Sequence, residues 1–483
     1  MNLLVVQRIL GILLMVFSST MLIPLGVSLY FQDANQTPFI DSFIGLLITG
    51  LLVWWPVRKQ HRELRLRDGF VVVALFWVVL SLAGAVPLVL STNPHIALTN
   101  AVFEAVSGFT TTGATILVGL DELPKSLLYY RHQIQWLGGL GMVVLAVALL
   151  PMLGIGGMQL LKAETPGPVK DSKLTPRITE TAKALWLVYV LITVLCATCY
   201  WLAGMTPFDA ICHSFSTVST GGFSTHDANL GYFNNPAVEV IAIVFMILGG
   251  INFSLHFLAW RHLSFKDYLR DAELRVFISL MLIFSIILSL GLITHHVFAN
   301  EGFAIRSAVL HVVSLMTSTG FVATNFTLWP GALPVMLILI TFAGGCAGST
   351  AGGMKVIRWM LMWKQGAREI NRLVHPSAVF PVKIGGRPVP WRIIDAVWGF
   401  FAVYVGCFAV LMVGLIATGS DQVTAFSAIA TSINNAGPGL GDVAMDFTTL
   451  SITGKWLSIL AMLLGRLEVY PMLILITPAF WKQ

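Results

Sequence analysis

The chain has 483 residues, of which 56% are hydrophobic and only 11% are charged. Soluble domains carry about 25% charged residues, so this composition excludes a soluble globular fold and predicts an integral membrane protein. The formal net charge of +6 is distributed over connectors between apolar segments, so it offers no basic patch on a folded domain, and nucleic acid is not an expected partner.

Ten membrane-spanning helices are predicted, because apolar runs long enough to cross a bilayer recur along the chain. The alternation of about ten residues that marks a transmembrane β-barrel is missing from the sequence. The first run lacks a cleavage pattern of small residues and is interpreted as a span of the mature chain. The predicted spans cover roughly residues 3–31, 38–56, 69–90, 128–151, 184–204, 236–259, 275–298, 333–362, 394–419 and 455–479.

Most lysines and arginines fall in four connectors, residues 58–69, 156–183, 261–275 and 355–392. The remaining connectors carry few basic residues. Because basic loops stay in the cytoplasm, these four connectors and both termini are predicted to be cytoplasmic.

One basic connector contains the segment 378–390, which alternates apolar and polar residues around Gly385 and Gly386. This pattern predicts a small β-hairpin at the membrane surface, with a proline-rich loop without strand pairing as an equal alternative. The five cysteines lie in or beside apolar runs and are interpreted as packed thiols, without a disulfide framework.

Four similar polar segments stand between successive spans. They read EAVSGFTTTGAT, HSFSTVSTGGFS, HVVSLMTSTGFV and AIATSINNAGPG. The segments align without gaps on Gly113, Gly222, Gly320 and Gly437, and a Leu-Gly-Gly motif or a variant of it follows each at a similar distance. Four matched copies indicate a fourfold internal repeat.

Each repeat comprises a span, a re-entrant segment and a second span, so all four repeats share one orientation. This arrangement differs from that of inverted-repeat transporters. The predicted fold is therefore an all-α integral membrane protein in which four parallel M1-P-M2 repeats surround a central pore, with two extra N-terminal helices. The predicted divisions are 1–60 for the leading helices, then 61–160, 161–262, 263–375 and 376–483 for repeats 1 to 4, a cytoplasmic hairpin preceding the last.

The shared glycine permits a left-handed backbone at the same point of each repeat. Carbonyl oxygens just before it can form stacked rings of four and replace the hydration shell of a cation. Neutral oxygens suit a monovalent ion, because a divalent ion normally draws carboxylates. The predicted filter residues are Thr110, Thr111, Thr112, Gly113, Ser219, Thr220, Gly221, Gly222, Thr317, Ser318, Thr319, Gly320, Asn434, Asn435, Ala436 and Gly437.

Glu104, His213 and His311 occupy one aligned column, nine residues before the glycines. Two interpretations are open for these polar side chains in an apolar setting. They either make hydrogen bonds at the base of a pore helix or handle protons.

The second span of repeat 3 contains a run of glycines that disfavours a continuous helix. The run predicts an unwound loop, residues 344–353, that acts as a gate; a helix-packing face of small residues is the alternative. Arg466 stands in the matching span of repeat 4. It either makes a structural ion pair, with Glu468 or with the loop carbonyls, or faces the cavity, bonds the loop and raises an electrostatic barrier to cations. The predicted gate residues are Gly345, Gly348, Ser349, Thr350, Gly352, Gly353 and Arg466.

The segments TTTGAT, STGGFST, TSTGF and NNAGPGLG, together with the later GGCAGSTAGG and LGRLEV, resemble the Trk/Ktr/HKT superfamily of potassium transporters, in its bacterial TrkH branch. The resemblance covers essentially the whole chain. It implies potassium uptake through a fourfold filter and a loop that lies across the pore. Four filter glycines imply a preference for potassium, whereas a serine in the first repeat accompanies sodium permeation.

The resemblance also implies a homodimer in the bacterial inner membrane and a TrkA-type cytosolic regulatory protein that binds NAD(H) or another nucleotide. Potassium is the expected transported ion, no organic cofactor is expected on this chain, and coupling to protons by symport is left open. The rival interpretations are a proton- or sodium-coupled secondary transporter of another cation and a membrane enzyme. Neither inverted repeats with midplane carboxylates nor a nucleophile–base motif supports these rivals, so an enzyme is not predicted.

Overall fold

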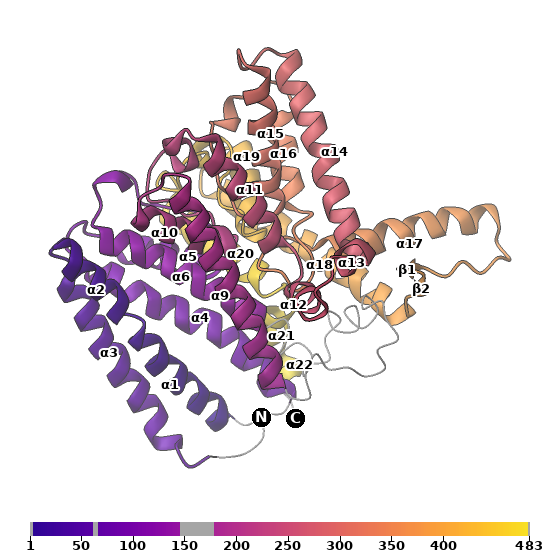
Figure 1. Ribbon diagram of the computed structural model, residues 1–483. Coiled ribbons are helices and arrows are strands. Elements are labelled where there is room, and N and C mark those ends of the chain that lie inside the picture. Colours follow the sequence, from indigo (N-terminus) through magenta and orange to yellow (C-terminus); the bar gives the residue numbers. More distant parts are fainter. Residues whose placement is uncertain (1–2, 61–65, 145–177, 482–483) are drawn as a thin grey trace.

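The computed structural model describes residues 3–60, 66–144 and 178–481. Within these ranges the chain is helical apart from turns, loops and one small sheet (Figure 1). Two of the predicted basic connectors lie partly outside the described residues, namely 61–65 of the first and 156–177 of the second. The end of the predicted span 128–151 also lies outside them.

In the described part of the chain, six helical segments are long and apolar enough to cross a membrane. The first combines α1 (Leu3–Ser19) with α2 (Leu22–Phe31), and the second is α3 (Gln36–Trp54) with the 3-10 turn η1 (Trp55–Val57). The others belong to α4 (Leu66–Leu90), α9 (Ile178–Leu202), α14 (Ala272–Thr294) and α18 (Trp391–Ala417).

Apart from the short turn between α1 and α2, three of the ten predicted spans are interrupted, and one of these interruptions was predicted from the glycine run. The span 236–259 is divided into α11 (Pro236–Gly250) and α12 (Phe253–His262), which meet at an angle of 96°. Ile251 is extended there, and the Asn252 side chain caps α12. The span 455–479 is divided into α20 (Ile452–Arg466) and α21 (Tyr470–Ile476), where Glu468 and Val469 both have positive φ.

The third interruption lies where the glycine run predicts it. Helix α16 (Leu333–Thr341) ends before the run, and α17 (Val356–Val374) begins after it. The residues between them are not helical, so the alternative of a helix-packing face is wrong. Five glycines in one short stretch explain the interruption, since each costs about 1 kcal/mol relative to alanine inside a helix.

Four short helices precede the four aligned glycines: α5 (Leu98–Phe109), α10 (Pro207–Val218), α15 (Glu301–Met316) and α19 (Gln422–Ile433). Each is mostly buried. A helix of 12 residues is only about 18 Å long, so these helices are too short to cross a bilayer.

The helices that follow them close a ring of contacts. Helix α6 (Lys125–Val144) packs against α10, α11 against α15, α16 against α19, and α20 against α5. The short helices α10, α15 and α19 therefore each contact the second long helix of the preceding unit. The short helix α5 of the first unit contacts α20, the second long helix of the last unit. The leading helices α1 and α2 lie outside this ring, where they contact α4 and α6.

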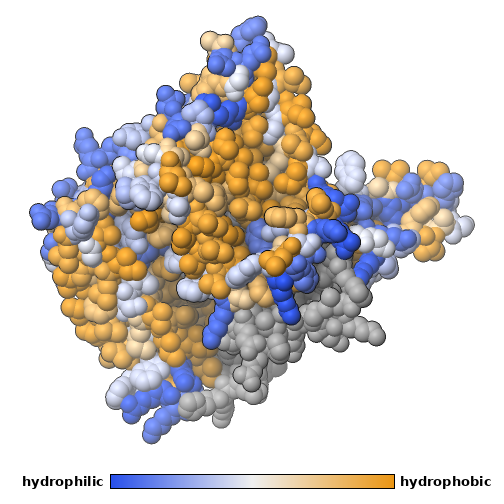
Figure 2. All heavy atoms as spheres, in the orientation of Figure 1, coloured by the Kyte–Doolittle hydropathy of each residue, from blue (hydrophilic) through white to orange (hydrophobic). Residues whose placement is uncertain are grey.

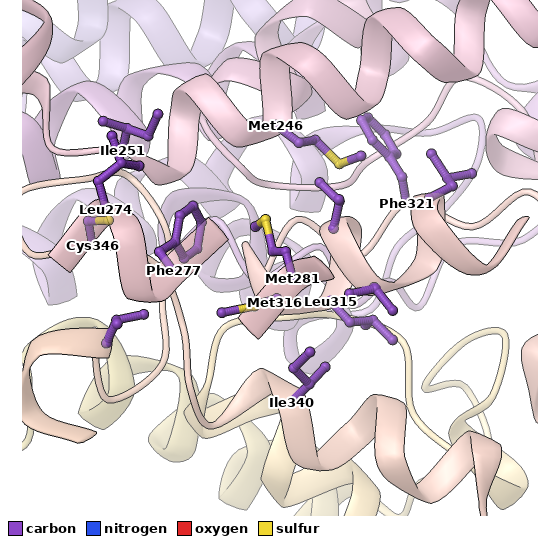
Figure 3. Close-up of a cluster of buried hydrophobic side chains, with 14 of the residues drawn as sticks. Met246, Ile251, Leu274, Phe277, Met281, Leu315, Met316, Phe321, Ile340 and Cys346 are labelled. Carbon is purple, nitrogen blue, oxygen red and sulfur yellow. The ribbon is translucent and has the colours of Figure 1, made fainter. Parts of the chain in front are cut away.

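The apolar core lies between the helices. Figure 3 shows one part of it, where side chains from α11, α14, α15 and α16 interdigitate. The outer surface is apolar as well: Figure 2 shows hydrophobic side chains over the flank of the molecule and polar ones gathered towards its ends. Apolar surface both inside and outside is what a bilayer environment requires.

The predicted β-hairpin is confirmed. Strand β1 (Lys383–Ile384) pairs antiparallel with β2 (Arg387–Pro388). Gly385 and Gly386 both have positive φ, as a two-residue hairpin turn demands. The hairpin and α17 project from the body (Figure 1). The remaining short elements are η2 (Leu120–Glu122), η4 (Asn229–Phe233), α13 (Lys266–Arg270), η5 (Phe326–Leu328), η6 (Gly441–Val443) and α22 (Pro478–Trp481).

Candidate functional site

The four segments that follow the short helices have one backbone conformation. We call residues 110–113, 219–222, 317–320 and 434–437 the glycine segments. In each, the amide of the third residue donates to a carbonyl five residues earlier, at 2.7–2.8 Å. The acceptors belong to the aligned hydroxyl-bearing residues of the short helices, Ser107, Ser216, Ser314 and Thr431.

The glycine segments also share their backbone torsions. The second residue of each, Thr111, Thr220, Ser318 or Asn435, has φ of 53–54°. The final glycine has φ of 78–84°. Non-glycine residues pay about 1–2 kcal/mol for a left-handed backbone, so four repeated instances indicate a geometry that the surrounding structure maintains.

The glycine segments approach one another in cyclic order. A Cβ atom placed on Gly113 would lie 2.2 Å from the Gly221 oxygen, and one on Gly222 would lie 1.9 Å from the Thr319 oxygen. The corresponding distances are 2.4 Å from Gly320 to the Ala436 oxygen and 2.9 Å from Gly437 to the Thr112 oxygen. Each glycine therefore abuts the carbonyl of the third residue in the next segment, and the series closes on itself. We call this arrangement the glycine–carbonyl ring.

One cavity of about 280 Å³ lies against the ring, and all four aligned glycines line it. Its walls come from the stretches that follow the glycines, including Thr115, Asn229, Val322 and Asp446. The ring is therefore the floor of a single chamber to which every unit contributes.

Side-chain hydrogen bonds hold the glycine segments in place. The Thr110 hydroxyl donates to the Val106 carbonyl at 2.7 Å and lies 2.7 Å from the Thr112 hydroxyl, and Thr317 makes the equivalent contacts in the third unit. The Asn435 amide crosses from the fourth unit to the Thr112 hydroxyl at 2.9 Å. These contacts hold Thr110, Thr112 and Thr317 in place, while the backbone carbonyl of the third residue in each segment faces a glycine of its neighbour.

The aligned polar column makes hydrogen bonds at the base of the short helices. Glu104 pairs with the buried Arg131 at 2.7 Å, and the Ile116 amide also donates to it. His213 contacts the Asp209 carbonyl at 2.9 Å, and His311 contacts the Ser307 carbonyl at 2.7 Å. These contacts agree with the hydrogen-bonding interpretation of the column, and Arg131 is a partner that the sequence pattern did not reveal.

A second charged cluster joins the first two units beside the cavity. The imidazole of His226 hydrogen-bonds to Asp121 and lies 3.6 Å from the Asp209 carboxylate. Burial by itself lowers the pKa of His226, but the hydrogen bonds and charges of Asp209 and Asp121 outweigh it, so the pKa of His226 lies above its ordinary value. The charged imidazole therefore stabilises the folded state.

The stability of this cluster should depend on pH. Because the pKa of His226 is raised by folding, its stabilisation is complete below the pKa of the unfolded chain, about 6.5, and is lost as the pH rises through the folded value. We expect the detergent-solubilised protein to melt at a higher temperature near pH 6 than near pH 8. His226→Gln should reduce this difference, as measured by thermal unfolding followed with intrinsic fluorescence; an identical difference in the variant would contradict the assignment.

The 344–353 loop lies against three of the four glycine segments. The Thr350 hydroxyl is 3.2 Å from that of Thr220, the Gly352 amide donates to Ser318, and the Gly353 amide donates to the Asn434 carbonyl at 3.1 Å. In the first unit, the buried Thr111 hydroxyl has no hydrogen-bond partner among the described residues.

Arg466 lies beside this loop, with 2% of its surface exposed. Its guanidinium donates to the Thr350 carbonyl at 2.9 Å and to the Gly138 carbonyl at 3.3 Å. Among the described residues Glu468 pairs with Arg358, so Arg466 does not pair with Glu468; its contact with a loop carbonyl fits both the structural interpretation and the barrier interpretation. Carbonyl dipoles and the Trp77 ring, 5.3 Å away, help to offset the buried charge of Arg466.

The structure brings the predicted filter residues together in one ring. Of the predicted gate residues, Thr350, Gly352 and Gly353 contact this ring, and Arg466 bonds the loop at Thr350.

Three features were not predicted from the sequence, namely the pairing of Arg131, the bend between α11 and α12, and the contacts of Glu273, described below. Gly249, Gly250 and the N-cap residue Asn252 stand at the bend and were a signal for it, whereas the contacts of Glu273 join residues that are far apart in the chain. The ion pair between Arg131 and Glu104 could have been suspected from the sequence, because Arg131 is a charged residue in an otherwise apolar span.

The fold and this site define an all-helical, multi-pass integral membrane protein built around one central ring. Residues 35–483 match the family described as TrkH, cation transport protein. The chain belongs to the TrkH family of cation transport proteins.

Two relatives named Trk system potassium uptake protein TrkH illustrate the similarity. That of Vibrio parahaemolyticus serotype O3:K6 is 53% identical, and that of Escherichia coli strain K12 is 50% identical, each over 99% of both chains. The crystal structure of the potassium transporter TrkH from Vibrio parahaemolyticus superposes with a TM-score of 0.93 at 50% identity and covers 100% of both chains. These relatives are transporters and not enzymes.

Proposed function

We propose that the protein takes up potassium through the glycine–carbonyl ring. The observation that carries the proposal is the closed series in which each aligned glycine abuts a carbonyl of the next unit. A ring of neutral carbonyls can replace the hydration shell of a monovalent cation, and the adjoining chamber gives ions access to it. The potassium assignment is also supported by the names of the full-length relatives.

The four units act as M1-P-M2 repeats around this pore, with residues 61–160, 161–262, 263–375 and 376–483 as their bounds. Residues 1–60 form the two leading helices. The short helices α5, α10, α15 and α19 are the pore helices, and the four glycine segments are the filter. Their cyclic contacts with α6, α11, α16 and α20 support this division.

The 344–353 loop and Arg466 form the gate. The loop contacts the glycine segments of units 2, 3 and 4, which supports a position directly across the path of the ion. Arg466 bonds the loop and adds a positive charge at the same level. Like charges repel strongly where water is excluded, so the arginine opposes the passage of cations while the loop is in place.

The protein works in the bacterial inner membrane with both termini in the cytoplasm. It forms a homodimer, and a TrkA-type protein that binds NAD(H) or another nucleotide regulates it from the cytosol. Basic connectors such as 261–275 and 364–392 are the surfaces where that regulator docks. Exposed basic residues on α12, α13 and α17 support this placement.

Isotope uptake into vesicles tests the proposal. We expect the native chain to take up rubidium, a substitute for potassium, in clear preference to sodium. Gly113→Ser should lower that preference by about tenfold or more, because a side chain there displaces the Gly221 carbonyl 2.2 Å away from its Cβ position. Equal uptake of rubidium and sodium by the native chain would remove the potassium assignment.

A further inference from the structure

Glu273 is a buried carboxylate in the first turn of α14, with 3% of its surface exposed. One of its oxygens, Oε1, accepts two backbone hydrogen bonds, from the Ala347 amide at 2.8 Å and from the Ile357 amide at 3.1 Å. Ala347 belongs to the 344–353 loop, whereas Ile357 is the second residue of α17. A single side chain from α14 therefore bridges the loop and the helix that follows it.

The start of α17 needs such a partner. The first amides of a helix have no acceptor within the helix, and a side chain at the N-cap usually supplies one. Here the N-cap residue is Lys355, whose side chain makes no capping hydrogen bond and points its ammonium group at the Ala351 carbonyl. Glu273 supplies the missing acceptor from another helix, and its negative charge also suits the positive end of the α17 dipole.

The loop has a second attachment, to the end of α11. The Cys346 amide donates to the Gly250 carbonyl at 2.9 Å, and the Thr350 amide lies 3.3 Å from the Gly249 carbonyl. These carbonyls are available because α11 ends at the bend before α12, which leaves its last carbonyls without helical partners. Figure 3 shows Cys346 at the same end of the core as Ile251 and Leu274.

We propose that Glu273 is a positioning residue that holds the 344–353 loop across the ion path, in addition to the attachment to the α11 bend. This inference rests on the proposed gating role of the loop and adds the side chain that maintains its closed position. Without Glu273, the attachment of the loop to the bend remains. The loop is then expected to open more often while the fold persists.

Cys346 gives a native reporter of loop opening, because it is buried in the loop and is in no disulfide. The experiment uses the full-length, detergent-solubilised chain in which the other four cysteines are alanine. The rate of Cys346 alkylation by a maleimide is measured by mass spectrometry. We expect Glu273→Ala to accelerate labelling about tenfold or more, since two hydrogen bonds to a charged acceptor are lost.

Two further variants separate position from charge. Glu273→Gln keeps an oxygen that can accept both amides, so its labelling rate should lie between those of the parent and Glu273→Ala. Glu273→Asp is shorter by one methylene and cannot reach both amides, so it should accelerate labelling even if Glu273→Ala fails to fold. Parent-like labelling rates in Glu273→Asp and in a folded Glu273→Ala would overturn the proposal.

Two controls exclude a general loosening of the fold. Asp271→Asn removes a carboxylate two residues away, where Asp271 accepts from the Leu274 amide at 2.7 Å, yet asparagine remains a good N-cap. It should leave the labelling rate of Cys346 unchanged. In a second chain that retains only the buried Cys212 of α10, Glu273→Ala should not accelerate labelling; acceleration there as large as at Cys346 would also overturn the proposal.

The Cys346 labelling experiment and the rubidium-to-sodium uptake experiment test the two proposals independently. Failure of Gly113→Ser to alter the rubidium-to-sodium ratio would remove the filter assignment, while the Cys346 labelling rates would still report on the loop. Conversely, Glu273→Ala should raise rubidium leak without changing that ratio, because Glu273 does not touch a glycine segment. A changed ratio would show that it acts on the ring and not on the loop.

Discussion

Gly222→Ala should reduce rubidium uptake by at least about tenfold, because overpacking of a rigid site costs about 1–3 kcal/mol or more. A Cβ atom at this position would lie 1.9 Å from the Thr319 oxygen, whereas optimal contacts between nonbonded heavy atoms are about 3.5–4.0 Å. The Thr319 carbonyl must therefore move, and the ring loses its cyclic geometry. Isotope uptake into vesicles reconstituted with equal amounts of folded protein measures the effect.

Gly119→Ala is the matched control for this prediction. Gly119 also has a left-handed backbone, with φ of 71° compared with 78° at Gly222, but a Cβ atom there would meet nothing within 4 Å. Gly119→Ala therefore has the energetic cost of a left-handed backbone at alanine, but its Cβ atom does not collide with a carbonyl. We expect it to retain most of the native uptake. Equal losses in the two variants would show that backbone strain, and not closure of the ring, explains the effect.

Arg466→Ala should raise rubidium uptake by about tenfold or more. A unit charge several ångströms from a cation costs on the order of 2 kcal/mol at an effective dielectric constant of about 20. The substitution also removes the hydrogen bond to the Thr350 carbonyl, so the loop loses one attachment. Uptake without added regulator, where the gate should be closed for most of the time, gives the clearest measurement.

Arg466→Lys separates the two contributions. Lysine keeps the charge but lacks the fork that reaches the Thr350 and Gly138 carbonyls together. An intermediate increase is expected if charge and attachment both matter. Native uptake and native gating in Arg466→Ala would refute the role assigned to this residue, provided that size-exclusion chromatography shows the variant to be folded.

The glycine–carbonyl ring could be predicted from the sequence because the polar segment that forms it occurs four times. One polar segment with a glycine has many interpretations, but four copies aligned on Gly113, Gly222, Gly320 and Gly437 require a shared conformation. The structure contains that conformation, with the same torsions and the same amide-to-carbonyl bond in each copy. The β-hairpin was also accessible, since Gly385 and Gly386 favour a tight turn between alternating residues.

The contacts that hold the 344–353 loop could not all be predicted from repeated motifs in this way. Glu273 and Ala347 are separated by 74 residues, and their contact depends on the packing of α14 against the loop. Long-range contacts of this kind leave no periodicity in the chain, so local patterns cannot reveal them. The bend at Ile251 is different, because Gly249, Gly250 and the N-cap residue Asn252 stand there and are local signals for the end of one helix and the start of another.

The ring is made by one polypeptide and not by four identical subunits, and this has a consequence for its control. Among the described residues, the glycine-rich loop lies in the third unit, and an arginine stands at the shared glycine position in the fourth. In a homotetramer every subunit would repeat such a loop and such a guanidinium group, and the four like charges would repel one another. A single polypeptide instead lets one unit carry the loop and another the arginine, as the proposed gate requires.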